Sequence, residues 1–412
     1  MYPHQTIFDM AINWDSQRIP VKASERKKGP YPYYGAQGIV DYVDDYIFDG
    51  FYILVAEDGE NLRSQKENVA TLASGKFWVN NHAHVISSKP HCNTKYIFYA
   101  LSDIDFTSYI TGSTIPKLSQ ASLGNIELPC PSLEVQDAIA SILGSLDDKI
   151  DLNRRTNETL EAMARALFRD WFVDFGPTRA KMAGEASYLA PELWELFPDR
   201  LDDEGKPEEW ETSTFDHCIT ILTGGTPKTS VPSYWNGNIP WFSVVDAPTE
   251  SDVYVLDTTK KITQDGLNNS AASILPENTV IISARGTVGK LALTSGNMTM
   301  NQSCYGIRGS NGYGQYFILQ ALKNILNELK NNTHGSVFDT ITRQTFSTIS
   351  TTLPSLRLAQ HYESMVSKYF ERILVNCQES RTLSRLRDLL LPQLMSGEIS
   401  IRDAEKMVED VA

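Results

Sequence analysis

Residues 133–171 read LEVQDAIASILGSLDDKIDLNRRTNETLEAMARALFRDW, and residues 356–394 read LRLAQHYESMVSKYFERILVNCQESRTLSRLRDLLLPQL. These segments belong to a longer alignment without gaps, of residues 112–171 with residues 335–394, at a constant offset of 223 positions. Identical pairs in this register include Ser141 and Ser364, Ile150 and Ile373, Asn153 and Asn376, and Leu160 and Leu383. Because one register holds over the whole length, the chain carries an internal duplication.

Each copy predicts a long amphipathic helix with a narrow apolar stripe. The stripe positions are Ile139, Leu143, Leu146, Ile150, Asn153, Asn157, Leu160, Ala164, Leu167 and Trp171 in the first copy, and Val366, Tyr369, Ile373, Asn376, Ser380, Leu383, Arg387, Leu390 and Leu394 in the second. Spacings that alternate between three and four residues are typical of a coiled coil. Both stripes turn polar at the equivalent place, and buried polar groups there would fix the register of the pairing.

Two such helices in one chain can cover each other's stripe by pairing. At 1.5 Å per residue, roughly forty residues give a rod of about 60 Å. Antiparallel pairing would create a pseudo-two-fold axis and place the preceding globular regions at opposite ends. The alternative is that each helix packs on its own domain as a core element.

The predicted fold class is therefore α+β, with two domains of mixed α/β character separated by a pair of long antiparallel helices and related by a pseudo-two-fold internal repeat. The predicted boundaries are 1–131 for the first domain, 132–175 for the first long helix, 176–209 for a proline-rich acidic linker, 210–354 for the second domain, 355–396 for the second long helix and 397–412 for a C-terminal tail. The two globular regions differ in sequence where the helices agree. A duplicated frame with unlike domains is what a two-part recognition protein needs.

Strand-like runs with Gly and Asp turns fill both globular regions. The predicted strands are 39–43, 46–48, 52–56, 77–79, 84–87 and 126–128 in the first half, and 253–256, 279–283, 291–294, 304–308 and 349–353 in the second, with a helix over 315–330.

The overall charge of −14 argues at face value against a nucleic-acid ligand. The excess is uneven, since residues 132–205 carry a net charge of −8 while residues 1–131, 206–354 and 355–412 carry −3, −2 and −1. The globular regions are thus close to neutral, and local basic surfaces remain compatible with DNA if partner subunits neutralise further phosphates.

Motifs for catalysis are missing from the sequence. There is no Pro-Pro, Asn-Pro or Asp-Pro dipeptide of the kind that an amino-methyltransferase loop requires, and no Gly-x-Ser-x-Gly elbow. Residues 285–290, RGTVGK, resemble a phosphate-binding loop but lack its first glycine and have Leu291 at the Ser/Thr position. We predict a tight glycine turn between strands there. Asp147 and Asp148 suggest nuclease carboxylates, but their place in the helix favours solvated surface charges.

The histidines and cysteines give no recognisable metal pattern. His82, His84 and His91-Cys92 form the one ligand-like cluster, and a polar strand face explains it better than a metal. The five widely spaced cysteines form neither a disulfide framework nor a zinc motif. Without a secretion signal or a membrane-length apolar run, the sequence predicts a cytoplasmic protein.

Basic, aromatic and amide residues gather in glycine- and proline-rich segments of both halves. Lysine and arginine neutralise phosphates, and a Gln or Asn amide can bind adenine. The candidate DNA-binding residues are Arg26, Lys27, Lys28, Tyr33, Tyr34, Gln37 and Lys117 in the first half, and Thr226, Lys228, Tyr234, Trp235, Arg285, Thr287, Lys290, Asn301, Gln302 and Arg343 in the second. Each segment alone is compatible with an ordinary surface turn; together they favour DNA.

Several segments resemble the specificity subunit of Type I restriction–modification enzymes, and the resemblance covers nearly the whole chain. They are residues 118–136, 166–177, 207–211, 33–38, 223–228, 234–235 and 239–241. The second copy departs from the pattern at residues 358–361, where LAQH only loosely keeps the Glu-x-Gln pattern of residues 134–136.

The resemblance implies two target-recognition domains joined by antiparallel helices, each domain contacting one half of a split double-stranded DNA site. It also implies two methyltransferase subunits, which bind S-adenosylmethionine and methylate adenine, and motor-nuclease subunits that complete the restriction complex. No cofactor is expected in this chain. We expect each domain to enter the major groove of one half-site, with the helix pair setting a gap near one DNA turn.

Two alternatives from other classes stay open at this point. One is a fragment of a combined restriction–methyltransferase enzyme, and the other is a coiled-coil adaptor that does not bind DNA. Methyl transfer by the purified chain would favour the first. Sequence-dependent retention of DNA would exclude the second.

Overall fold

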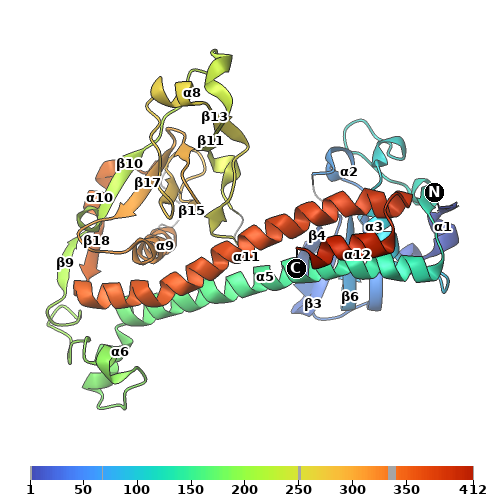
Figure 1. Cartoon of the computed structure of the whole chain (residues 1–412). Coiled ribbons are helices and arrows are strands. Elements are labelled where there is room, and N and C mark those ends of the chain that lie inside the picture. Colours follow the sequence, from blue (N-terminus) through green and yellow to red (C-terminus); the bar gives the residue numbers. More distant parts are fainter. Residues whose placement is uncertain (1, 67, 249–251, 333–339, 412) are drawn as a thin grey trace. The chain divides into compact units, whose positions relative to one another are not determined.

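A computed structural model describes residues 2–66, 68–248, 252–332 and 340–411. The chain forms two compact units, one of residues Met1–Ile150 with Arg381–Ala412 and the other of residues Asp151–Ser380. The two long helices, α5 (Leu133–Phe172) and α11 (Leu356–Ser396), contribute to both units (Figure 1). The pair of long helices that the repeat predicted is therefore confirmed.

The first unit is built on a six-stranded sheet in the order β2-β7-β5-β6-β3-β4. Its strands are β2 (Ala11–Asn13), β3 (Lys28–Gly35), β4 (Gly38–Val43), β5 (Phe48–Ala56), β6 (Ala70–Val79) and β7 (Ala83–Ser88), and β1 (His4–Thr6) pairs separately with β8 (Glu127–Pro129). Its short helices are α1 (Ile7–Met10), α2 (Asn61–Ser64), α3 (Thr94–Ser102) and α4 (Gln120–Gly124). Helix α3 and the start of α5 pack into the core beneath the sheet.

The predicted C-terminal tail is a helix in the structure. Helix α12 (Ile401–Glu409) begins at Ser400, whose hydroxyl accepts the backbone N–H of Asp403. Ala404 is fully buried in the core of the first unit, and Ile401 and Met407 pack against the same core. The capping pair Ser400 and Asp403 is the sequence signal for this helix.

The second unit contains a five-stranded sheet, β10-β17-β14-β15-β12, and a three-stranded sheet, β13-β11-β16. The strands are β10 (Ile219–Thr223), β11 (Trp235–Phe242), β12 (Tyr254–Val255), β13 (Lys260–Ile262), β14 (Val280–Ser283), β15 (Leu291–Thr294), β16 (Thr299–Met300) and β17 (Cys304–Gly309), and β9 (Glu211–Thr214) pairs with β18 (Ser350–Leu353). The helices are α6 (Gly176–Met182), α7 (Pro191–Trp194), α8 (Gln264–Asn268), α9 (Gln315–Asn332) and α10 (Arg343–Thr348). Mixed α/β character in both units confirms the predicted fold class.

Contacts between α5 and α11 show that the helices run antiparallel. Within the second unit, the Asn153 side-chain amide donates to Ser380 at 3.3 Å, and that of Asn376 donates to Asn157 at 2.8 Å. Asn376 follows Asn153 by 223 residues, and Ser380 follows Asn157 by the same offset. The two contacts are therefore equivalents under the internal repeat, and the polar positions of the stripe meet each other as predicted.

Each helix also packs on the sheets, which agrees in part with the alternative that it serves as a core element. In the second unit, Phe168 and Trp171 of α5 lie in one core with Tyr362 and Phe370 of α11. The Tyr362 hydroxyl donates to the backbone carbonyl of Ala164 at 2.9 Å. In the first unit, the Asp147 carboxylate accepts hydrogen bonds from Arg387 and from the Tyr99 hydroxyl, both at 2.7 Å. Asp147 thus has a structural role and not that of a nuclease carboxylate.

Helix α9 begins against a carboxylate from α11. The Glu363 carboxylate accepts the backbone N–H groups of Tyr316 at 3.1 Å and of Phe317 at 2.8 Å. Burial raises the pKa of Glu363 above its ordinary value of 4.5, and the N–H donors oppose that rise only in part. Because the folded chain holds the proton more tightly, the Glu363 contribution to the free energy of unfolding falls as pH rises above 4.5.

We expect Glu363→Ala to lower the free energy of unfolding by about 1–2 kcal/mol, since two N–H groups at the start of α9 lose their acceptor. Glu363→Gln keeps an acceptor and cannot ionise. Between pH 4 and pH 7, the melting temperature should therefore fall less for Glu363→Gln than for the unchanged chain. An equal decline in both would mean that the Glu363 carboxyl does not cause it.

No helix in the described part of the chain combines the length and the apolar character needed to cross a lipid bilayer.

Candidate nucleic-acid interface

One edge of the second unit collects most of the predicted residues of that half. Strands β11 and β16 are parallel, so the segments that follow Phe242 and Met300 leave the sheet side by side. The backbone N–H of Asn301 donates to the Phe242 carbonyl at 2.9 Å. The loop 223–228 joins them, since the Gly225 N–H donates to the Met300 carbonyl at 3.0 Å and the Trp241 indole donates to the Gly225 carbonyl at 2.9 Å.

The predicted polar residues of this loop meet as pairs. The Thr226 hydroxyl donates to the side-chain carbonyl of Gln302. The Trp235 indole donates to the Lys228 carbonyl at 3.3 Å and its ring packs edge-on against Trp241. Tyr234 ends the short turn Pro232–Tyr234 just before this strand and is half-buried, and its carbonyl accepts the Thr263 N–H. The Asn301 side chain accepts the Ser303 N–H at 3.0 Å, so Asn301 shapes the turn from which Gln302 projects.

Residues 285–290 form the predicted glycine turn, between β14 and β15. Gly286 and Gly289 have φ angles of +76° and +83°, which L side chains rarely adopt. The turn is closed by Ser283, whose hydroxyl donates to the Thr287 carbonyl at 2.5 Å and accepts the Lys290 N–H at 2.8 Å. Arg285, Thr287 and Lys290 lie on it, and all three are exposed.

The turn adjoins the Gln302 segment and the start of α10. The Ala284 N–H donates to the Ser303 carbonyl at 2.8 Å, and the Ile341 N–H donates to the Ala284 carbonyl at 2.9 Å. Arg343, two residues after Ile341, is exposed at the start of α10. The structure thus connects three segments that are far apart in the sequence.

The charges on this edge favour an anionic ligand. Within the described residues, Lys228, Arg285, Lys290 and Arg343 are exposed and form no ion pair with a carboxylate. Two nearby carboxylates already have partners within the chain. Asp257 pairs with Lys261 at 3.0 Å, and Asp246 accepts four hydrogen bonds from Ser243 and Thr259. Unpaired cations beside occupied carboxylates suit contact with phosphates.

In the first unit, residues 28–35 are the strand β3 and not the loop that the glycine and proline content suggested. Tyr33 is fully buried, and its hydroxyl bonds the backbone of Val21. The Arg26 guanidinium lies 4.3 Å above the Tyr33 ring and contacts Asp41 at 3.3 Å. Two hydrogen bonds hold the pKa of Asp41 below its ordinary value. The stronger effect comes from the Tyr42 backbone N–H and the next from the Arg26 side chain. Tyr33 is therefore closed to solvent, while the half-buried Arg26 joins Tyr33 to Asp41.

The remaining first-half candidates divide between the two ends of the β3–β4 hairpin. Lys27 and Lys28 are exposed near its open end, whereas Gln37 is exposed at its tip. The half-buried Tyr34 points its ring at Phe77, and its carbonyl accepts from Asn80 at 3.0 Å. The tip is thereby tied to the turn over residues 80–82.

The segment that contains Lys117 is joined to the turn over residues 80–82 by backbone hydrogen bonds. The Glu57 N–H donates to the His82 carbonyl at 2.9 Å, and the Leu118 N–H donates to the Glu57 carbonyl at 2.8 Å. The Lys117 ammonium lies 3.2 Å from the Glu57 carboxylate and is half exposed. Of the predicted residues, Gln37 and Lys117 are thus both linked to residues 80–82, whereas Lys27 and Lys28 lie at the other end of the hairpin.

His84 supports this edge from beneath and is not a metal ligand. It is buried, with Nδ1 2.6 Å from Asp15 and Nε2 2.8 Å from the Leu118 carbonyl oxygen. Burial alone would raise the pKa of Asp15, but the hydrogen bond and charge of His84 bring it below its ordinary value. His82 contacts Asp58 at 2.7 Å. No group of three or more candidate metal ligands occurs among the described residues.

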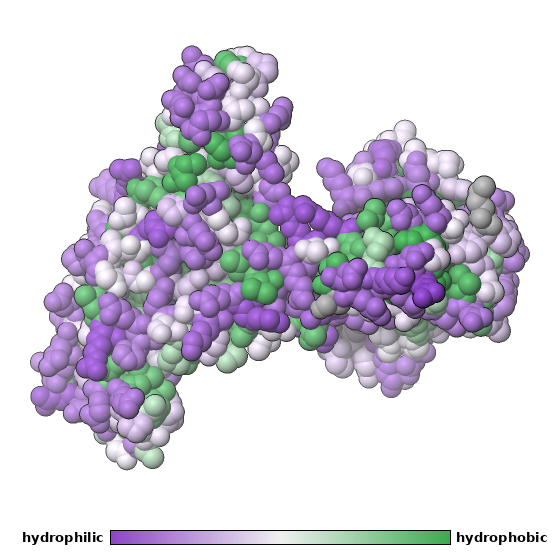
Figure 2. All heavy atoms as spheres, in the orientation of Figure 1, coloured by the Kyte–Doolittle hydropathy of each residue, from purple (hydrophilic) through white to green (hydrophobic). Residues whose placement is uncertain are grey.

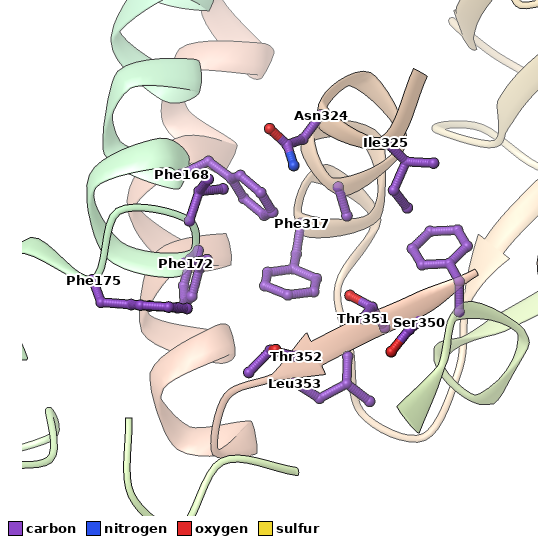
Figure 3. A pocket seen from close by; sticks show the side chains of 13 residues that line it. Phe168, Phe172, Phe175, Phe317, Asn324, Ile325, Ser350, Thr351, Thr352 and Leu353 are labelled. Atoms are coloured by element: carbon purple, nitrogen blue, oxygen red, sulfur yellow. The ribbon is translucent and has the colours of Figure 1, made fainter. Parts of the chain in front are cut away.

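A cavity of about 240 Å³ in the second unit lies away from these residues. It is bounded by the end of α5, by α9 and by β18, and Phe168, Phe172 and Phe317 line it (Figure 3). Its lining contains no ionisable side chain and none of the predicted site residues. It therefore offers neither an acid–base pair nor a cation for a phosphate.

Two features of the second unit were not predicted from the sequence. Asn236, with φ of +61°, begins a bulge between Trp235 and Ile239, and Asn236 and Asn238 are exposed there. The other is a short turn over Val244–Asp246. The sequence signals were Asn-Gly-Asn at 236–238 and the capping pattern Ser-x-x-Asp at 243–246.

The visible face of each unit is mainly hydrophilic or intermediate, with hydrophobic residues in separate groups (Figure 2). Such a surface suits a ligand that is contacted mostly through polar groups.

Comparison with known proteins gives one consistent result. The family profile described as "Type I restriction modification DNA specificity domain" matches residues 6–162 and 207–379. The chain is 29% identical over 375 residues to the Type I restriction enzyme HindI specificity subunit of Haemophilus influenzae, covering 77% of this chain and 81% of that protein. It is 25% identical over 349 residues to the MjaIX specificity subunit of Methanocaldococcus jannaschii, covering 81% and 75%.

The fold agrees with a solved structure as well. The crystal structure of the Type I restriction–modification S subunit from M. genitalium superposes with a TM-score of 0.60 at 15% identity, covering 96% of each chain.

Proposed function

The chain belongs to the family of Type I restriction–modification DNA specificity subunits, and from that premise we propose that its two units bind the two halves of a bipartite double-stranded DNA site. It is the non-catalytic specificity subunit of a Type I restriction–modification complex. The observation that carries the proposal is the duplicated helix pair, whose equivalent contacts Asn153–Ser380 and Asn376–Asn157 hold α5 against α11 within the second unit. We assign target recognition to residues 1–131 and 210–354, with 176–209 as the linker.

The proposed contacts differ in kind between the two units. In the second unit, Lys228, Arg285, Lys290 and Arg343 contact phosphates, while Thr226, Thr287 and Gln302 lie where base edges would pass. Tyr234, Trp235 and Asn301 support that edge. In the first unit, Gln37 and Lys117 contact DNA, and Lys27 and Lys28 contribute charge further along the hairpin. Each unit enters the major groove, and the helix pair sets the gap between half-sites.

The proposed partners are two methyltransferase subunits, which carry S-adenosylmethionine, and motor-nuclease subunits, all acting in the cytoplasm. We infer that this chain binds no cofactor itself. The antiparallel pair supports two methyltransferase subunits, because a pseudo-two-fold axis presents two equivalent surfaces to two copies of one partner.

The test is to co-express the chain with its methyltransferase and to map methylated adenines across a genome. We expect methylation at one bipartite sequence. Methylation without a bipartite pattern, or DNA retention that does not depend on sequence, would contradict the proposal. The second result would favour the coiled-coil adaptor, and methyl transfer by the chain alone would favour the enzyme fragment.

Arg285→Ala with Lys290→Ala should weaken binding at the second half-site alone. Two lost phosphate contacts should reduce affinity on the order of tenfold or more at physiological salt and make the salt dependence shallower by about two units of slope. The measurement is a binding titration against probes that keep one half-site and scramble the other. As a matched control, Lys149→Ala with Arg372→Ala removes two cations from the long helices. Equal losses on both probes would contradict the division between the units.

A further inference from the structure

The turn over residues 243–246 in the second unit presents one valine to solvent. Val245 is 77% exposed. The turn begins directly after Phe242, the residue whose carbonyl accepts the N–H of Asn301. Val245 therefore lies on the same edge as Gln302, close to the unpaired cations described above.

The turn is held rigidly from both sides. The Ser243 backbone N–H and hydroxyl donate to one oxygen of Asp246, at 2.9 and 3.0 Å. The Thr259 backbone N–H and hydroxyl donate to the other oxygen, both at 2.7 Å. With four donors on one carboxylate, the turn cannot fold its valine inward without breaking hydrogen bonds.

Gln302 follows Asn301, the residue that bonds Phe242, and is exposed on the same edge. Its side-chain carbonyl accepts from Thr226, and its amide NH₂ has no partner within the described residues. An amide held in this way presents a donor. Donors that project from a cationic edge match the base acceptors of the DNA major groove.

We propose that Val245 contacts the C5-methyl group of a thymine in the half-site bound by the second unit, next to a base acceptor bound by the Gln302 amide. This rests on the proposed DNA-binding function and names the chemistry that its second half recognises. An aliphatic side chain beside a thymine methyl is a known mode of direct readout, and the methyl is the one apolar group on that groove edge. The polar groups of the turn, Ser243 and Thr259 bonded to Asp246, suit a groove better than an apolar protein surface.

The test replaces each thymine of the mapped second half-site with uracil, one at a time, because uracil lacks only the methyl group. The complex of the chain with its methyltransferase should bind one uracil probe about fourfold more weakly, the ratio that corresponds to one buried methyl group. Val245→Ala should bind that probe and the thymine probe equally. Val375→Ala, which shortens an exposed valine on α11, should keep the fourfold ratio.

Equal binding of thymine and uracil at every position, or a half-site without thymine, would overturn this assignment. So would loss of the methyltransferase from the complex with Val245→Asp, since that result would make the turn a protein contact. These results differ from failure of the proposed function, in which the unchanged complex would not distinguish the mapped site from a scrambled one.

Discussion

Lengthening both long helices by one heptad should greatly weaken binding to the natural site, and no single new spacing should restore the affinity. Seven residues add about 10.5 Å, which equals about three base pairs along DNA. Three base pairs also rotate the second half-site by roughly 100° about the duplex. A heptad leaves the facing stripes in register, so the second unit would meet the wrong face of the DNA.

Three heptads should restore binding at a longer site. They add about 32 Å, which equals nine to ten base pairs and nearly one full turn of the duplex. The insertions belong after Ile150 in α5 and after Thr382 in α11. The contacts Asp147–Arg387 and Asn153–Ser380 place these two positions opposite each other.

The measurement is methylation of a library in which the spacer length varies. We expect the one-heptad protein to lose on the order of a hundredfold in affinity, because an entire half-site is no longer contacted. The three-heptad protein should select spacers longer by nine or ten base pairs. As a control, 21 residues inserted after Gly184, an exposed position in the linker, should leave the spacing unchanged. Natural spacing in the three-heptad protein would show that the helices do not set it.

The helices were predictable because their signal is repeated and periodic. A stripe with spacings of three and four residues, present twice in one register, specifies both the elements and their mutual pairing. The position of the polar interruption, at Asn153 and Asn376, required no structure to find. The turn over residues 285–290 was predictable for a related reason, since two glycines at fixed spacing leave few backbone conformations.

The first recognition surface was harder to predict because the same residues suit two structures. Pro30 and Pro32 suggested a loop, yet β3 tolerates them because β6 pairs with β3 only at Tyr33 and Tyr34. A basic residue beside a tyrosine predicted a ligand contact, and the structure adds a contact within the chain, since the Arg26 guanidinium lies 4.3 Å above the Tyr33 ring. Which of two exposed ends a lysine occupies depends on strand register, which no local pattern specifies.

Replacing Asn376 by aspartate should destabilise the second unit more than any surface change. Asn376 is fully buried between α5 and α11, and its side-chain NH₂ donates to Asn157 at 2.8 Å. Its own carbonyl oxygen has no hydrogen-bond partner within the described residues. The substitution Asn376→Asp would place a carboxylate in this fully buried site, so we expect a loss of about 3–5 kcal/mol in the free energy of unfolding.

The loss of stability in Asn376→Asp should depend on pH, and the direction of that dependence shows whether the buried charge causes it. Burial favours the neutral carboxylic acid, so the pKa of the new carboxyl would lie above that of a free aspartate. Destabilisation should therefore be largest near neutral pH and should shrink as pH falls and the carboxyl takes up a proton. Chemical denaturation at pH 5 and pH 7.5 measures both values.

Two further variants separate the charge from the position. Val375→Asp places the same charge one residue earlier, where the side chain is half exposed, and should cost less than about 1 kcal/mol. Asn157→Leu combined with Asn376→Leu removes both polar groups, and should be neutral or stabilising while weakening the preference for one helix register. Asn376→Asp could lower the free energy of unfolding no more than Val375→Asp does. That result would mean that water reaches the Asn157–Asn376 pair. The pair could then not select the helix register on which the spacing of the two units depends.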